Sequence, residues 1–242
     1  MLEGPRSGDA PAGGTPRCLV HVARLGQLKE HHARLLDESE RTRLEQYRFE
    51  ADRQRFILGA VLARSGAAEA LHADAASITL DRTCPDCGTP HGKPSVVGGG
   101  PQISVSHSGD VVLVAVTQAA PVGVDVEVIN GDRMDYAAVL PSVCGPGESA
   151  FVTDLADFLT CWTRKEAVLK ATGHGLRLAM PDVVVSPPRR IARLESFPSP
   201  RKVECWLTDL DIGDGYAAAI AVLTPGPVEV EVIDASAALA LA

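Results

Sequence analysis

The sequence predicts an α+β protein built from two similar helix-plus-sheet halves. The segments Val111–Val128 and Tyr216–Val232 both read as an apolar strand, a turn with proline and a strand of alternating character. Their turn prolines are about 106 residues apart. At nearly the same offset, the helical segments Gly59–Leu62 and Glu166–Leu169 each precede a short strand. Two halves joined near residues 120–125 explain this repeat, and chance similarity of apolar strands is the alternative.

The composition excludes several classes of protein. Of 242 residues, 45% are hydrophobic, which provides a substantial core for one large domain or two small ones. A net charge of −8 argues against nonspecific binding to nucleic acid or to an anionic membrane. No apolar run reaches the roughly 20 residues of a membrane span, and the first residues lack the apolar core of a signal peptide. We therefore expect a cytoplasmic protein whose six cysteines are reduced.

The chain divides into three expected parts. Residues 1–17 are rich in Gly, Pro and Ala and should form a disordered tail. The first half should span residues 18–122, with a strand at Cys18–Leu25 and a helical, arginine-rich region at Lys29–Arg64. The second half should span residues 123–242.

A helix with chemical character is predicted within Phe158–Gly175, where strong helix formers dominate and Gly173 provides the stop. The side chains of Trp162, Glu166 and Lys170 follow at i, i+4 and i+8, so they share one face. Lys165 lies about 100° around the helix from Glu166. Taken alone, this helix reads first as a solvated one carrying an ordinary Glu166–Lys170 ion pair.

Two further stretches change that balance. Asp125 and Glu127 are two residues apart in an expected strand, so both carboxylates face the same side. Together with Glu166 they form a set of hard oxygen ligands that suits Mg²⁺. The stretch Ser106–Gly109 offers hydroxyls, the His107 imidazole and a glycine turn that can contact phosphate, although a single histidine is more often structural.

In this order and spacing, four motifs resemble the Sfp-type 4′-phosphopantetheinyl transferases over residues 40–185. They are HGKPSV, SVSHSG, GVDVE and the Trp-x-x-Lys-Glu-Ala-x-x-Lys helix. The resemblance implies a pseudo-twofold pair of helix-plus-antiparallel-sheet subdomains. It also implies transfer of phosphopantetheine from coenzyme A to a serine of an apo acyl or peptidyl carrier protein, with release of 3′,5′-adenosine bisphosphate. We expect Mg²⁺ as cofactor and a monomer; polyketide, nonribosomal-peptide and fatty-acid carriers all remain possible substrates.

The resemblance also implies roles for individual residues. The Mg²⁺ ligands would be Asp125, Glu127 and Glu166. The pyrophosphate would be held by His107, Lys165 and Lys170. The pocket for the nucleotide and its 3′-phosphate would be lined by Arg43, Arg55, Lys93, Pro94 and Ser106. The position usually filled by lysine one turn before Arg43 is Glu40 here. Glu166 could act as the base for the serine proton or only as a metal ligand.

Two stretches lie outside this set. Cys84, Cys87 and His91 could bind zinc, but a structural zinc normally has four protein ligands, so Cys18 or another residue would have to complete the site. A turn with two free thiols is the alternative. The segment Tyr136–Phe151 carries few charges and could form an apolar ledge that docks the carrier, or it could simply pack in the core.

Competing functions have recognisable marks. A noncatalytic coenzyme A or carrier-binding module of the same fold would be expected to lose a metal carboxylate or Lys170, and the sequence retains them. Another Mg²⁺-dependent phosphotransferase would need a phosphate loop such as G-x-x-x-x-G-K-[ST], which the sequence lacks. A catalytically active phosphopantetheinyl transferase is therefore the leading interpretation.

Overall fold

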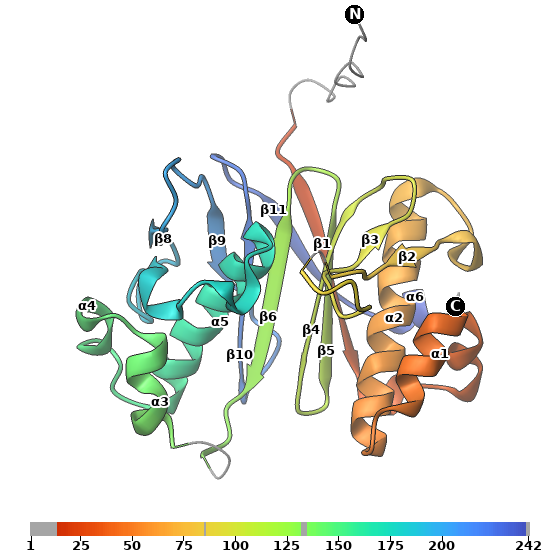
Figure 1. The fold of residues 1–242 in the computed structure, drawn as a ribbon, viewed down its shortest axis with the longest axis horizontal. Coiled ribbons are helices and arrows are strands. Elements are labelled where there is room, and N and C mark those ends of the chain that lie inside the picture. The colour runs from red at the N-terminus through yellow and green to blue at the C-terminus, as the bar shows by residue number, and fades with distance from the viewer. Residues whose placement is uncertain (1–13, 85, 132–134, 241–242) are drawn as a thin grey trace, which may run out of the picture.

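The computed structural model describes residues 14–84, 86–131 and 135–240. Two halves lie side by side, and each packs a long helix, α2 or α5, against a sheet (Figure 1). This arrangement confirms the predicted α+β class. Residues 1–13 of the predicted tail lie outside the described residues, whereas Arg17 already belongs to the first strand. No helix of the described chain combines the length and apolar character needed to cross a membrane.

The first half contains a four-stranded sheet in the order β11-β1-β5-β4. Its strands are β1 (Arg17–Arg24), β4 (Gln102–Ser108), β5 (Val111–Thr117) and β11 (Glu229–Asp234). Its helices are α1 (Glu38–Glu45), α2 (Glu50–Leu71) and α6 (Ser236–Ala240). A small hairpin joins β2 (Leu80–Asp81) to β3 (Ser95–Val96). Short 3-10 helices cover Leu25–Gln27, Glu30–Leu35 and Ala75–Ser77.

The second half contains a three-stranded antiparallel sheet in the order β6-β10-β9. Its strands are β6 (Val122–Val128), β9 (Trp206–Asp209) and β10 (Tyr216–Val222). Its helices are α3 (Tyr136–Val143), α4 (Pro146–Ser149) and α5 (Leu155–Thr172). A second hairpin joins β7 (Val184–Val185) to β8 (Leu194–Ser196). Two further 3-10 helices cover Gly175–Arg177 and Met180–Asp182.

The helical region predicted at Lys29–Arg64 is divided into the 3-10 helix at Glu30–Leu35, α1 and the first part of α2. Asp37 caps α1 by accepting the Glu40 backbone N–H, and the chain turns before α2 begins. The middle of α2 is apolar on all sides and fully buried, so the helix forms the centre of the core of the first half. It continues to Leu71 and ends at His72, which adopts a left-handed conformation with φ of 52°.

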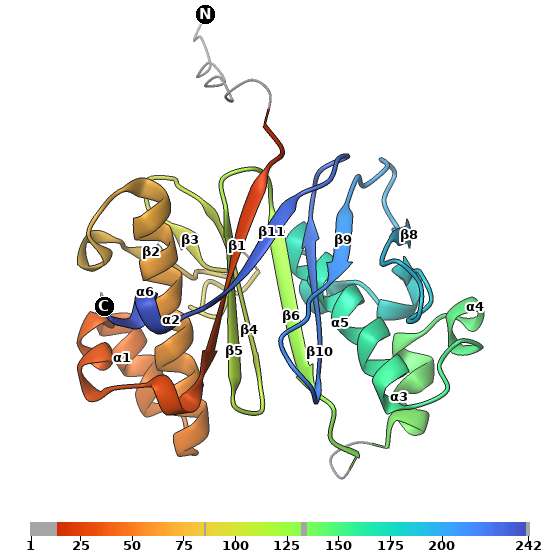
Figure 2. The same cartoon turned by 180° about the vertical axis from the view of Figure 1, so that it is seen from behind.

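The chain crosses between the halves twice, once in each copy of the predicted repeat. Strand β5 lies in the first sheet and β6 in the second, whereas β10 lies in the second sheet and β11 returns to the first. Cys18 pairs with Val230 in the parallel ladder of β1 and β11, and the two strands run side by side behind the molecule (Figure 2). The predicted division at residues 123–242 is therefore wrong for the C-terminal segment, because β11 and α6 complete the first half.

The two sheets meet where β4 lies beside β6. These strands belong to different sheets and share no backbone ladder. Serine side chains connect them instead. Three hydroxyls of β4 accept backbone N–H groups of β6 at 3.0, 3.3 and 3.1 Å: Ser104 from Val124, Ser106 from Val126 and Ser108 from Val128. This row of hydrogen bonds sets the register of the two halves and places the carboxylates of β6 opposite the serines of β4.

Gly123 allows α5 to lie directly on β6. A Cβ atom at this position would be 2.0 Å from the Ala167 carbonyl oxygen and 2.5 Å from the Ala171 nitrogen. Both obstructing atoms belong to the backbone of α5, so they cannot move aside as a flexible side chain would. Since Gly123, Asp125 and Glu127 alternate along β6, the same face that meets α5 carries both carboxylates.

We expect Gly123→Ala to lower the free energy of unfolding by at least about 1–3 kcal/mol, because overpacking forces the helix away from the sheet. The measurement is urea unfolding followed by circular dichroism. Gly226→Ala is the control, since no atom lies within 4 Å of its Cβ position. Equal unfolding midpoints for the two variants would contradict the proposed close packing.

Candidate active site

Helix α5 positions half of the site. Asp154 caps its first turn by accepting the Asp157 N–H at 2.8 Å, and Gly173 ends it with φ of 71°. The predicted stop is confirmed, and the helix begins three residues earlier than Phe158 because of this cap. Glu166 and Lys170 both lie on its partly exposed side, next to β6.

Asp125 is the most buried of the three predicted metal ligands, with 4% of its surface exposed. Its Oδ1 accepts from the Ser106 hydroxyl at 2.7 Å and from Lys170 Nζ at 2.6 Å. Its Oδ2 is buried without a hydrogen-bond partner among the described residues. A buried carboxylate oxygen that lacks a partner is costly, and a cation bound there would satisfy it.

Glu127 and Glu166 surround the same space. Glu127 Oε2 accepts from the Ser108 hydroxyl at 2.8 Å. The pKa of each glutamate is raised, first by burial and also by the negative charge of Asp125. Three carboxylates this close repel one another unless positive charge lies between them. The donor set fits a hard divalent cation such as Mg²⁺. The three predicted ligands interact electrostatically across this space, although their oxygen atoms do not all lie within 4.8 Å of one another.

Lys170 supplies positive charge at this cluster. Besides contacting Asp125, its Nζ donates to the Ser106 hydroxyl at 3.0 Å and to the Val124 carbonyl at 3.1 Å. Lys93 lies behind it and donates to the carbonyls of Val122 and Lys170 at 2.7 and 3.2 Å. Burial lowers the pKa of Lys93 to about 8. Lys93 thus connects the end of α5 to β6.

The other predicted phosphate-contacting residues come from the first half. Arg55 Nε donates to the Gly109 carbonyl at 2.8 Å, which places its guanidinium at the turn after His107. The pKa of His107 is lowered, first by the protein that surrounds the ring and next by the positive charge of Arg55. The His107 residue is nevertheless exposed to solvent. Arg43 donates to the Pro90 carbonyl at 2.6 Å and lies over the Phe56 ring.

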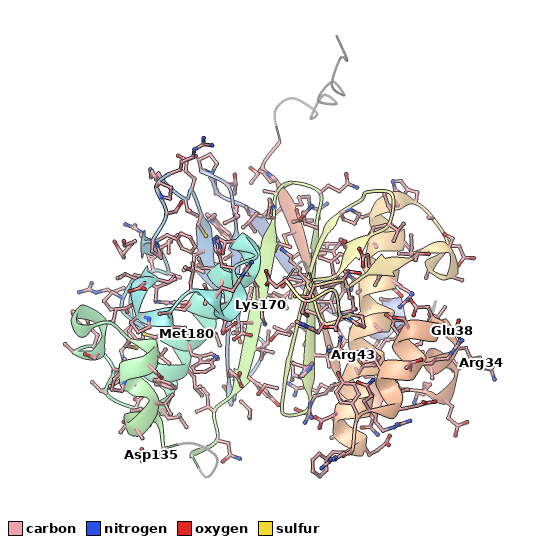
Figure 3. The ribbon with its side chains drawn as sticks, in the orientation of Figure 1. Arg34, Glu38, Arg43, Asp135, Lys170 and Met180 are labelled. Atoms are coloured by element: carbon pink, nitrogen blue, oxygen red, sulfur yellow. The ribbon has the colours of Figure 1, made fainter. Side chains whose placement is uncertain are left out.

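Pro94 is buried directly after Lys93, and Ser106 is buried against Asp125. Ser106 thus belongs to the carboxylate cluster. A surface hollow lined in part by Arg34, Asp37 and Arg41 contains none of the predicted residues. Arg34 lies at the outer edge of the first half, far from Lys170 at the central strands (Figure 3). The chemistry of the side chains, and not this hollow, therefore identifies the site.

Glu40 does not replace a phosphate-binding lysine. It is buried, and its carboxylate pairs with Arg64 at 2.7 Å and accepts the Asp37 N–H at 3.2 Å. These contacts close the N-terminus of α1 and fix it against α2. Glu40 is accordingly a structural residue of the first half.

The predicted role of Lys165 in holding the pyrophosphate is wrong. The structure turns this side chain into the core of the second half, where it is 0% exposed. Its Nζ pairs with Glu148 at 2.5 Å and donates to the carbonyls of Val143 and Met180 at 2.8 and 3.1 Å. Met180 lies to the left of Lys170 in Figure 3, within the second half. With its donors used there, Lys165 cannot hold the pyrophosphate.

The apolar ledge predicted at Tyr136–Phe151 is mostly core. Val143 is buried, and Val139 and Leu140 pack partly against the same cluster as Phe158. Phe151, at the end of the segment, is largely exposed, at 54%. The segment therefore offers much less docking surface than the sequence predicted.

Sequence reasoning missed the role of the serine row. Ser106 and Ser108 each donate to a carboxylate and accept a backbone N–H from β6, so they orient the predicted metal ligands. The signal was present as Ser-x-Ser-x-Ser, which has the same period of two as Gly-x-Asp-x-Glu. Only the meeting of the two strands shows that these patterns face each other.

We expect Lys165→Ala to destabilise the fold by about 3–5 kcal/mol, because it leaves the buried carboxylate of Glu148 without its partner. The measurement is guanidinium unfolding of the purified protein. Lys202→Ala is the control, since that side chain is 86% exposed and its ion pair spans 3.9 Å. A Lys165→Ala protein of unchanged stability would contradict the structural role.

Comparisons with known proteins agree with this geometry. A model of the 4′-phosphopantetheinyl transferase superfamily matches residues 121–221, and a model of a 4′-phosphopantetheinyl transferase N-terminal region matches residues 27–119. A phosphopantetheinyl transferase of Thraustochytrium is 33% identical over 160 residues, which cover 58% of this chain and 54% of that protein. The chain thus spans about half the length of that relative.

Two bacterial relatives extend the comparison. The 4′-phosphopantetheinyl transferase AcpT of Salmonella typhimurium is 36% identical over 34% of this chain and 46% of its own. The 4′-phosphopantetheinyl transferase HetI of Nostoc is 28% identical over 78% of this chain and 79% of its own. The two family models lie in sequence order, one on each half of the fold that forms the carboxylate site. The chain belongs to the 4′-phosphopantetheinyl transferase superfamily.

Proposed function

We propose that this protein transfers 4′-phosphopantetheine from coenzyme A to a serine of an apo acyl or peptidyl carrier protein and releases 3′,5′-adenosine bisphosphate. The observation that carries the proposal is the buried, unpartnered Oδ2 of Asp125, which interacts electrostatically with Glu127 and Glu166 and has Lys170 beside it. The names of the relatives support the same activity.

In the proposed reaction, the carrier serine oxygen forms a bond to the β-phosphorus of coenzyme A, and the bond from that phosphorus to the leaving adenosine bisphosphate breaks. Asp125, Glu127 and Glu166 would hold Mg²⁺, which neutralises charge on the phosphate oxygens. Lys170 lies close enough to Asp125 to add a second positive charge on the same side. Arg55 and His107 border the site from the first half and offer further donors to phosphate.

Glu166 is the candidate acceptor for the serine proton. It lies beside Asp125 and Lys170 at the proposed metal site, where a carboxylate can accept a proton from an incoming hydroxyl. Its two oxygens allow one to face the cation while the other takes the proton, directly or through water. The leaving bisphosphate departs without needing that proton, because it is already an anion.

The first test is intact-mass spectrometry of several apo carrier proteins incubated with the protein, coenzyme A and Mg²⁺. We expect one carrier at least to gain a single phosphopantetheine and excess EDTA to prevent the gain. Asp125→Ala should abolish transfer and retain the fold, because it removes a ligand and also relieves repulsion among carboxylates. Binding of coenzyme A without transfer to any carrier would favour the noncatalytic module.

A second test separates catalysis from binding. We expect Lys170→Ala to lower kcat by about 10²–10³, as for the loss of one donor to developing oxyanion charge. Steady-state kinetics with varied coenzyme A give kcat and KM separately. A higher KM at unchanged kcat would show that Lys170 only binds the substrate.

A further inference from the structure

A second group of metal-binding side chains lies outside the carboxylate site. Cys84, Cys87 and His91 occupy the loop between β2 and β3, and their ligand atoms all lie within 4.8 Å of one another. Cys87 Sγ is 2.9 Å from His91 Nε2. Within the described parts of the chain, this is the one group of three or more such residues that converges in this way.

The backbone of the loop brings these ligands together. The Gly88 N–H donates to the Cys84 carbonyl at 2.9 Å, and the Cys84 N–H donates to the Thr89 carbonyl at 2.9 Å. Gly88 has φ of +71°, a conformation that glycine adopts without strain. These bonds fold the chain back so that the two thiols and the imidazole point to one space. The convergence is therefore built into the turn.

The loop closes again just beyond His91. The Gly92 N–H donates to the Arg82 carbonyl at 2.6 Å, and a Cβ atom at Gly92 would lie 2.9 Å from that oxygen. Only glycine allows the two arms of the loop to approach so closely at this point. Both ends of the ligand segment are thus tied by backbone contacts.

We propose that Cys84, Cys87 and His91 bind a zinc ion that is separate from the Mg²⁺ of the active site. Two thiolates and an imidazole are the ligands that Zn²⁺ prefers, whereas Mg²⁺ requires oxygen. Cys18, one candidate for the fourth ligand, is not in this converging group and is buried in β1 at 1% exposure. Asp86 Oδ2 is 3.9 Å from Cys84 Sγ, but this carboxylate is outside the converging group, so the fourth position falls to water.

The position of this loop assigns the zinc a structural role. Lys93 follows His91 by two residues and donates to carbonyls of β6 and α5. Pro90, directly before His91, accepts from Arg43 of α1. Asp86 pairs with Arg177, beyond the end of α5, at 2.9 Å. The loop therefore connects both halves at the edge of the proposed coenzyme A site, and a zinc ion would hold it in shape.

The test measures metal directly, without coenzyme A or a carrier. The full chain, purified under reducing conditions without a histidine tag and washed with chelator, should retain one zinc per chain by elemental mass spectrometry. Replacement of zinc by Co²⁺ should produce the absorption bands of thiolate-bound tetrahedral cobalt. Cys87→Ser should lose the zinc, whereas the matched control Cys205→Ser, on a half-buried cysteine in the second half, should keep it.

A gentler variant guards against misfolding. Thr89 Oγ1 lies 2.9 Å from Cys87 Sγ, so Thr89→Val should weaken zinc binding by about 10–100-fold, as for the loss of a group that orients a ligand. Competition with a chromogenic chelator gives this ratio, and far-UV circular dichroism checks the fold. An unchanged affinity in both Thr89→Val and Cys87→Ser would overturn the proposal.

Two other outcomes would also overturn it. One is a chain that holds no zinc after the wash, and the other is an isolated protein in which thiol titration and peptide mapping show a Cys84–Cys87 disulfide. The zinc inference and the proposed function fail independently. Transfer activity in a zinc-free wild type rejects only the zinc, whereas a zinc-containing protein that modifies no carrier rejects only the transferase proposal.

Discussion

The contact between α5 and β6 is the constraint on which the rest of the structure depends. Gly123 permits the helix backbone to touch the strand, and this closeness brings Glu166 and Lys170 of the helix to Asp125 and Glu127 of the strand. A larger residue at position 123 would separate the helix from the carboxylates. The site therefore depends on backbone packing. Its side chains can reach one another because α5 and β6 lie in direct contact.

Charge in the second half is divided between two lysines of one helix. Lys165 neutralises Glu148 inside the core, and that carboxylate also accepts the N–H groups of Gly145 and Val185, so the pair holds α4, α5 and β7 together. Lys170, one turn further along, remains partly exposed and balances the carboxylates of the site. A buried ion pair requires such full hydrogen bonding to be tolerated. The rigid core behind α5 thus supports the reactive face in front of it.

The junction between the halves holds the site from the other side. Serines of β4 bind both the backbone and the carboxylates of β6, and β11, which follows the second half in sequence, completes the sheet of the first half. The loop of Cys84, Cys87 and His91 adds a third connection through Lys93 and Asp86. These links act at the junction of the two halves, where small displacements would move ligand atoms out of reach of one another.

The sequence by itself determined the α+β class, the helix that ends at Gly173, the strand pair around each proline turn and the three carboxylates, because each follows from local periodicity and spacing. Tertiary structure alone decided which side of α5 became buried, and this choice removed Lys165 from the site although it neighbours Glu166 in sequence. It also decided that β11 completes the first sheet and that Glu40 pairs with Arg64. Such outcomes depend on partners far away in the chain, which a local pattern cannot specify.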